Sequence, residues 1–281
     1  MYIGQGLKDI ICWPRPASPP VIRLEKKWEL EYGMPSTHAM TGAAVPFSIL
    51  IFTSCRYEYP FLLGVFFSLL WCALVCSSRI YLGMHSVLDV VAGLSLVALL
   101  FLWVIPVVDW LDPIILTDEF GALYMLSGAI LLALCSPGGD RWTPARGDTV
   151  VILGSAVGLI TGAWMNYQLG IISSNGPAID MPFPVMWPSY KMLGLSLLRL
   201  VIGLCIVLIT RQIAKSTTKT FFAGLVQSKN ISCVSNPTSR EIFVELSNKF
   251  VTYLIVGFNI VFLAPRSTDT PGLYRRIPPV I

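Results

Sequence analysis

The sequence predicts an all-α, polytopic membrane protein, and three observations lead to that prediction. Hydrophobic residues make up 54% of the 281 residues, whereas Asp, Glu, Lys and Arg together make up only 13%. The mean hydropathy is +0.69. The apolar residues gather in runs longer than the 10–14 residues that a buried helix of a soluble protein would need. A soluble domain carries roughly 25% charged residues, so an apolar soluble core explains this composition less well.

Seven apolar runs are each close to the length needed to cross a bilayer core, although the fourth is short. Lipid-exposed backbone must satisfy its own hydrogen bonds, and the runs lack the alternation of barrel strands, so we expect about seven transmembrane helices. The connecting stretches hold the charges and helix breakers, as in CRYEYP, DWLDP and SPGGDRWTPARGD. The expected spans are residues 39–55, 60–77, 86–108, 121–136, 149–166, 192–210 and 245–264.

The chain is expected to form one membrane domain. Residues 1–38 are an N-terminal segment without a helix of its own and without the apolar stretch of a signal peptide. Residues 39–264 are the transmembrane domain, and residues 265–281 are a polar tail. The seven cysteines are scattered through apolar runs, which indicates core packing rather than a disulfide framework or a metal site. The net charge of +4 is mild, so we expect membrane lipids and no nucleic acid as partners.

The two histidines of the chain each lie near the start of a long apolar run, and the second has a carboxylate nearby. His85 and Asp89 are four residues apart, so on a helix they share one face. Asp89 would accept a hydrogen bond from one ring nitrogen and leave the other free to act as a base or nucleophile. A helix-surface pair or part of a zinc site would show the same spacing.

An arginine and the second histidine complete this pattern. Arg79 follows Ser78 at the end of the 60–77 run and offers a planar fork for phosphate oxygens, although a snorkelling interface arginine would look the same. His38 lies in the first turn of its run, where Ser36 would cap the helix or donate to an anion. Helix N-termini attract anions, so two such ends facing one another would form an anion cradle.

The number of crossings places these groups on one side of the membrane. Two expected spans separate His38 from His85, so the chain returns to the same face between them. Lys8 and Arg15 precede the first span and share that face, although a basic juxtamembrane segment would explain them if they stood alone. We therefore predict a site that binds and transfers a dianionic phosphate. It would contain three cations, two histidines, a serine and an aspartate.

Three blocks of residues resemble the signature of the type 2 phosphatidic acid phosphatase, or lipid phosphate phosphatase, superfamily. The block PSTHAM, with Thr37 where the family usually has glycine, is similar to the sphingosine-1-phosphate phosphatase branch. The matching residues are Lys8 with Arg15-Pro16, then Pro35-Ser36-Thr37-His38, then Ser78-Arg79 with His85 and Asp89.

The resemblance implies a metal-independent phosphomonoesterase without a cofactor. His85 would attack phosphorus and form a phosphohistidine, Asp89 would orient His85, and His38 would protonate the leaving alkoxide and later activate water. The implied substrate is sphingosine-1-phosphate or its dihydro form, and the implied location is the endoplasmic reticulum membrane. The oligomeric state stays open. The implied phosphate-binding residues are Lys8, Arg15, Ser36, Thr37, Ser78 and Arg79.

Other functions remain open. Members of the family usually have a membrane helix before the first block, whereas this chain starts at MYIGQGLKD, so a shortened, catalytically impaired membrane protein that acts by association or by binding lipid would also fit. A transporter would place its charges in broken helices near mid-membrane, which the sequence does not show. Counting positive charges over seven spans puts the site face in the cytoplasm, whereas the resemblance implies the lumen.

Overall fold

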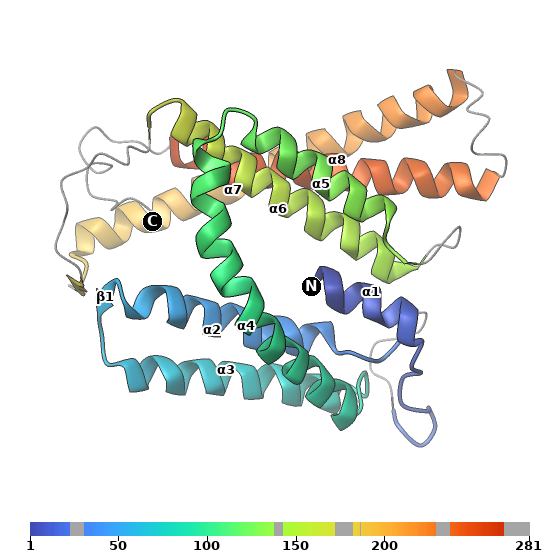
Figure 1. The fold of residues 1–281 in the computed structure, drawn as a ribbon, viewed down its shortest axis with the longest axis horizontal. Helices are drawn as coiled ribbons and strands as arrows, with labels where there is room; N and C mark the ends of the chain where they lie inside the picture. The colour runs from blue at the N-terminus through green and yellow to red at the C-terminus, as the bar shows by residue number, and fades with distance from the viewer. Residues whose placement is uncertain (23–30, 138–142, 172–181, 186, 229–236, 267–281) are drawn as a thin grey trace. The chain divides into compact units, whose positions relative to one another are not determined.

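A computed structural model describes residues 1–22, 31–137, 143–171, 182–185, 187–228 and 237–266 of the chain, and these residues are mostly helical (Figure 1). The elements are α1 Tyr2–Ile11, α2 Thr37–Ser54, β1 Tyr57–Glu58, α3 Phe61–Tyr81, α4 Val87–Thr117, α5 Gly121–Leu134, α6 Pro144–Gln168, β2 Phe183–Pro184, α7 Tyr190–Ser228 and α8 Pro237–Arg266. Each of the seven apolar runs corresponds to one helix, from α2 to α8. The all-α prediction is confirmed.

Five of the described helices, α3, α4, α6, α7 and α8, are long and apolar enough to cross a membrane. α5 has only 14 residues and α2 begins with polar residues, so fewer helices qualify than the seven spans predicted. Large apolar side chains point outward from the long helices; Leu62 is 80% exposed and Trp103 is 75% exposed. Such surfaces suit lipid rather than water. The protein is therefore a multi-pass membrane protein.

The prediction that the N-terminal segment has no helix is wrong, because Tyr2–Ile11 forms α1. Its two glycines and short length give it little helical preference of its own. Packing stabilises it instead: α1 buries Gly4, Gln5 and Lys8 and contacts α2. The sequence does contain a signal for this helix, because Ile3, Leu7, Ile10 and Ile11 recur at helical spacing. The three isoleucines are exposed, however, and the buried face is the one with Gly4, Gln5 and Lys8.

Several helices are longer than the apolar runs that predicted them, and three extend well beyond them at one end. α4 continues to Thr117, α7 continues to Ser228, and α8 begins at Pro237. The predicted spans end where charged residues begin, but charged residues, unlike Pro and Gly, are compatible with a helix interior. A helix therefore continues past the membrane edge. The predicted polar tail falls mainly on residues 267–281, which lie outside the described residues.

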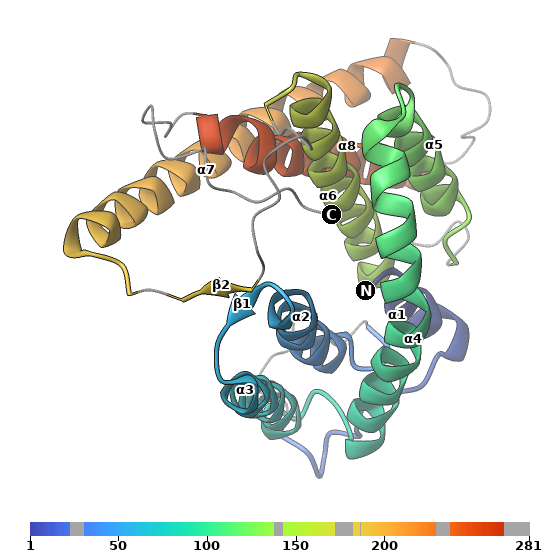
Figure 2. The same ribbon diagram turned by 60° about the vertical axis from the view of Figure 1, so that its left-hand side comes forward.

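The described chain divides into two compact units, and unit 1 comprises residues 1–108, 143–146 and 178–187. In this unit α2 and α3 lie side by side, as both ribbon views show (Figure 1, Figure 2). β1 follows α2 and pairs in parallel with β2. Met40 and Ala43 of α2 form a buried cluster with Val97 of α4. This cluster holds the first turns of α2 and the first half of α4 together.

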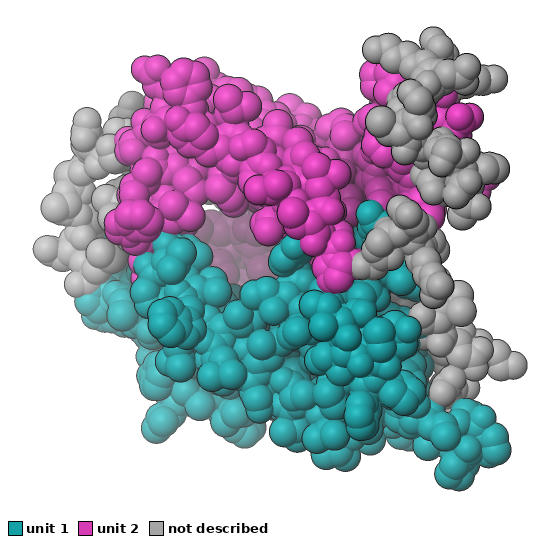
Figure 3. All heavy atoms as spheres, turned by 45° about the vertical axis from the view of Figure 1, so that its right-hand side comes forward, with its two compact units in different colours: residues 1–108, 143–146, 178–187 teal, residues 109–142, 147–177, 188–281 magenta. Residues whose placement is uncertain are grey.

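Unit 2 comprises residues 109–142, 147–177 and 188–281 (Figure 3). Within it α7 packs along α8, and α6 approaches α8 at a row of glycines spaced four residues apart. A Cβ atom at Gly154 would lie 2.5 Å from the carbonyl oxygen of Phe250, and one at Gly158 would overlap the carbonyl oxygen of Leu254. The two backbones can be this close only because glycine has no side chain.

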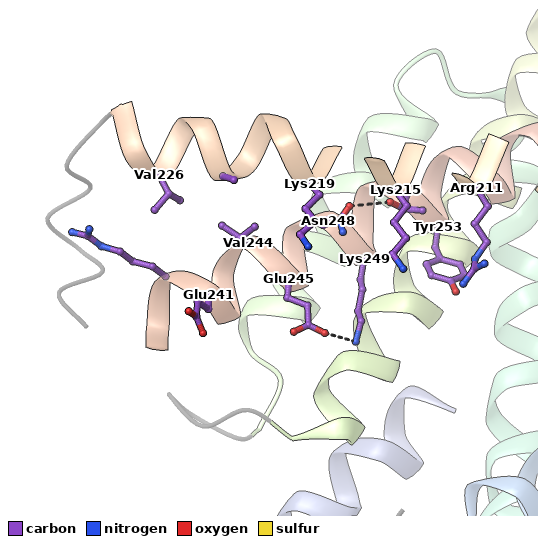
Figure 4. Close-up of a pocket in the computed structure, with 13 residues that line it drawn as sticks. Arg211, Lys215, Lys219, Val226, Glu241, Val244, Glu245, Asn248, Lys249 and Tyr253 are labelled. Carbon is purple, nitrogen blue, oxygen red and sulfur yellow. Dashed lines mark hydrogen bonds and ion pairs between the residues drawn. The ribbon is translucent and has the colours of Figure 1, made fainter. Parts of the chain in front are cut away.

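A cavity of about 610 Å³ lies between α7 and α8 (Figure 4). Its walls contain more cations than carboxylates, and the Lys249 ammonium lies 3.0 Å from the Glu245 carboxylate. None of the predicted site residues lines this cavity. Its charged residues are Arg211, Lys215, Lys219, Arg240, Glu241, Glu245 and Lys249.

Candidate active site

The three sequence blocks converge in unit 1, where the starts of α2 and α4 meet. The backbone N–H of Ser36 donates a hydrogen bond to the carbonyl oxygen of Asp89, at 3.0 Å. Ser36 is fully buried, and its hydroxyl accepts a hydrogen bond from the N–H of Ala39 at 3.4 Å, so it caps α2. The two helix starts that the sequence placed on one side of the membrane are therefore in contact.

His85 and Asp89 are both buried at the start of α4, with exposed fractions of 3% and 0%. His85 lies two residues before the helix begins, so the expectation that the pair shares a helical face is wrong. The Nδ1 atom of His85 still lies 3.8 Å from the Oδ2 atom of Asp89. This is too long for a hydrogen bond, and the two groups form an ion pair only when His85 is protonated.

The carboxylate of Asp89 has a second contact that fixes its position. Its Oδ2 atom accepts a 2.7 Å hydrogen bond from the N–H of Ser86, and the hydroxyl of Ser86 accepts one from the N–H of Asp89 at 3.2 Å. This reciprocal pair resembles a capping box at the start of α4. Among the described residues, Nδ1 of His85 and Oδ1 of Asp89 are buried without a hydrogen-bond partner.

The surroundings of both histidines favour the neutral imidazole. Burial lowers the pKa of His85 below its usual value, against the opposing effect of Asp89. His38 lies in the first turn of α2, ahead of the apolar part of the helix. Although the side chain of His38 is exposed, partial loss of hydration and the positive charges of Arg79 and Lys8 lower its pKa to about 4. A neutral imidazole retains the lone pair that a nucleophile or base needs.

Lys8 and Arg15, the two cations of the first block, are both paired with a carboxylate that sequence reasoning did not single out. Lys8 Nζ donates to Glu31 Oε1 at 2.8 Å, and Arg15 Nη2 donates to Glu31 Oε2 at 2.9 Å. Glu31 is 6% exposed. Glu31 is one of three glutamates between the first two blocks, with Glu25 and Glu29, and nothing in the sequence distinguishes it from the other two. No general rule assigns such a residue to a site.

Arg15 also links the first block to the other two through the backbone. Its Nε atom donates to the carbonyl oxygen of Glu31 at 2.7 Å, and its Nη1 atom donates to the carbonyl oxygen of Met84 at 2.8 Å. Met84 is the residue before His85. The guanidinium therefore ties the segment after α1 to the segment before α2 and to the turn before α4.

Ser78 and Arg79 lie in the last turn of α3 rather than after its end. The hydroxyl of Ser78 donates to the carbonyl oxygen of Val75 at 2.7 Å and accepts from Nε of Arg79 at 3.3 Å. Arg79 is half-buried, and among the described residues it has no carboxylate partner. Among the described residues it is therefore the cation of the cluster that is least neutralised by carboxylates.

Thr37 occupies the position at which glycine was expected, and its side chain is buried against α1. A Cβ atom at Gly4 would lie 3.2 Å from Cγ2 of Thr37 and 2.6 Å from Sδ of Met40. The threonine methyl thus occupies space left by the missing side chain of Gly4. This packing explains how the block tolerates a side chain at residue 37.

Comparisons with known proteins agree with the three blocks. Residues 1–112 match the PAP2 superfamily. Over 94% of its length the chain is 36% identical to sphingosine-1-phosphate phosphatase 2 of Mus musculus and covers 74% of that protein. The chain belongs to the PAP2 superfamily. The matched residues of this PAP2 chain include all three blocks of the candidate site.

Other relatives point to the same part of the PAP2 superfamily. The chain is 41% identical, over 94% of its length, to sphingosine-1-phosphate phosphatase 1 of Mus musculus, of which it spans 61%. Over 37% of its length it is 38% identical to a dihydrosphingosine 1-phosphate phosphatase of Schizosaccharomyces pombe, covering 27% of that protein. No solved structure matches this PAP2 chain.

Proposed function

We propose that this chain is a lipid phosphatase that hydrolyses sphingosine-1-phosphate, and its dihydro form, to the sphingoid base and phosphate. The observation that supports this most is the meeting of a buried, neutral histidine, its carboxylate neighbour and three cations at two helix starts. The names of the PAP2 relatives support the choice of substrate. We also propose the endoplasmic reticulum membrane as its location, from the same likeness.

The first chemical step uses His85 as the nucleophile. Its Nδ1 atom faces Asp89 at 3.8 Å, so the Nε2 lone pair is the one available to attack phosphorus. A shift of about 1 Å would give Nδ1–H a hydrogen bond to the carboxylate, which favours the tautomer with a free Nε2. A P–N bond forms, the P–O bond to the lipid alkoxide breaks, and a proton from His38 neutralises the alkoxide.

The protonation of His38 depends on the substrate. In the empty site the pKa of His38 is about 4, so the histidine is neutral at neutral pH. Loss of hydration lowers this pKa most, and a bound phosphoryl dianion opposes it by attracting the imidazolium and offsetting the nearby positive charges, so the pKa of His38 rises and the histidine gains a proton as substrate binds. His38 then acts as the acid in the first step.

The second step regenerates the enzyme. After giving up its proton, His38 takes one from a water molecule, whose oxygen attacks phosphorus while the P–N bond breaks. Inorganic phosphate leaves, and His85 regains its lone pair. Lys8, Arg15 and Arg79, with donors at Ser36, Thr37 and Ser78, bind the phosphate oxygens and stabilise the charge that builds up in each transition state.

A release assay tests this function. Membranes carrying the chain are given sphingosine-1-phosphate or phosphatidate in the presence of a chelator, with His85→Ala as the control. We expect release that is faster on the sphingoid lipid and at least about 100-fold slower in the variant. Equal release by the variant contradicts the mechanism. No release by folded wild-type protein favours the alternative, a catalytically impaired membrane protein.

A further inference from the structure

We propose that Glu31 is the counter-ion of the empty phosphate site and competes with the bound phosphoryl group for Lys8 and Arg15. This inference rests on the proposed function of the cluster as a phosphate site. Each oxygen of the Glu31 carboxylate accepts from one cation, at 2.8 Å and 2.9 Å. The carboxylate bridges the two cations in the way that two oxygens of a phosphate would.

Burial explains why the empty site needs this anion. The side chain of Lys8 is 1% exposed, and those of Arg15 and Glu31 are each 4% exposed. Two adjacent cations removed from water are strongly unfavourable unless an anion accompanies them. Glu31 supplies that anion when no phosphate is bound, so the cations stay charged and in place.

The geometry of Arg15 does not depend on the Glu31 charge alone. Arg15 also donates to the backbone carbonyl oxygens of Glu31 and Met84. Replacing Glu31 with the isosteric glutamine removes the negative charge but leaves both backbone contacts available. The variant therefore separates the charge of Glu31 from the position of the guanidinium.

Competition follows from the chemistry of the two anions. A carboxylate and a phosphoryl group are both acceptors that use the N–H donors of the same cations, and like charges a few ångströms apart repel each other. The net charge of the site before phosphate binds is +1. Its three cations, Lys8, Arg15 and Arg79, carry +3, and its two carboxylates, Glu31 and Asp89, carry −2. Without Glu31 the sum is +2. Glu31 therefore weakens the binding of product phosphate and favours its release.

The test measures the binding of inorganic phosphate to the full chain in phosphatidylcholine nanodiscs, from the shift of its thermal midpoint with phosphate concentration. We compare wild type, Glu31→Gln, and the matched control Glu58→Gln, an exposed carboxylate in β1. Glu31→Gln is expected to melt at a lower temperature without phosphate and to bind phosphate about tenfold more tightly. Glu58→Gln is expected to bind it like wild type.

A second pair of variants keeps the test decisive if Glu31→Gln does not fold alone. Lys8→Gln removes one buried cation, so Glu31→Gln in that background leaves a smaller excess of positive charge. The double variant should bind phosphate about tenfold more tightly than Lys8→Gln. Equal or weaker binding after Glu31→Gln overturns the counter-ion role and leaves the phosphatase proposal standing. No phosphate binding by any of the proteins, wild type included, overturns both.

Discussion

The Nδ1 atom of His85 lies 3.8 Å from the Oδ2 atom of Asp89, and the same Oδ2 atom accepts a hydrogen bond from the N–H of Ser86. One carboxylate therefore caps α4 and faces the histidine that precedes it. The helix start and the proposed nucleophile are placed by the same side chain. This arrangement makes the two roles of Asp89 separable by mutation.

Asp89→Asn should lower kcat by at least about 100-fold with little change in KM, because the amide no longer stabilises the charge that builds up on His85. Ser86→Ala removes the other half of the cap. It should cost about 0.5–2 kcal/mol of stability while kcat stays within about twofold. Steady-state rates and chemical unfolding of both variants check this. A loss of kcat in Ser86→Ala as large as that in Asp89→Asn would mean that Asp89 acts only as a cap.

The two histidines should give two titrating signals in a histidine-labelled NMR sample, because the chain contains only these two. We expect both to titrate below about 6.5, the ordinary value for histidine, with His38 near 4. Arg79→Met removes a positive charge that disfavours the imidazolium, so the pKa of His38 should rise. A His38→Gln sample assigns the signals. Titration of both signals at or above 6.5 would contradict the burial of His85 and the cation-rich surroundings of His38.

Arg79 should contribute far more to activity than the cations of the α7–α8 cavity. Arg79→Ala should lower kcat/KM by about 100-fold or more, since it removes a donor to the transition-state charge. The double variant Lys215→Ala/Lys219→Ala removes two charges from a cavity without catalytic groups, and its kcat/KM should stay within about twofold of wild type. Release assays on matched amounts of folded protein measure both. A larger loss of kcat/KM in the cavity variant would mean that the phosphate site lies in unit 2 rather than in unit 1.

Gly158→Ala should destabilise unit 2, because a Cβ atom there overlaps the carbonyl oxygen of Leu254. A cost of about 1–3 kcal/mol is typical of such overpacking. Gly203 of α7 has open space around its missing Cβ, so Gly203→Ala should leave stability unchanged or raise it by up to about 1 kcal/mol. Unfolding in mixed micelles compares the two. Equal effects would mean that α6 and α8 are not in backbone contact at Gly158.

Much of this molecule was predictable because long apolar runs allow few structures in lipid. The seven runs led to seven helices, and counting two crossings between His38 and His85 brought the starts of α2 and α4 to one side. What the sequence did not predict depends on contacts between distant segments. α1 is held by packing on α2, and Glu31 pairs with Lys8 from a distance of 23 residues. The apolar spacing in residues 3–11 indicates a helix but not its buried face, and no local pattern indicates the partner of Glu31.

One detail of the predicted geometry of the site was wrong. The sequence placed His85 and Asp89 on one helical turn, whereas α4 begins only at Val87. Asp89 itself sets that boundary through its bond to Ser86, so His85 precedes the helix. The departure comes from capping chemistry, which competes with the simple i, i+4 rule at helix ends.

The central claim is that His85 carries the phosphoryl group, and trapping that intermediate tests it most directly. The chain in nanodiscs is mixed with ³²P-labelled sphingosine-1-phosphate, quenched in alkali within milliseconds, and mapped by proteolysis. We predict label that is stable to alkali, labile to acid and confined to the peptide containing His85, with none in folded His85→Ala. Phosphate release without any labelled histidine, or label that persists in His85→Ala, would contradict the account.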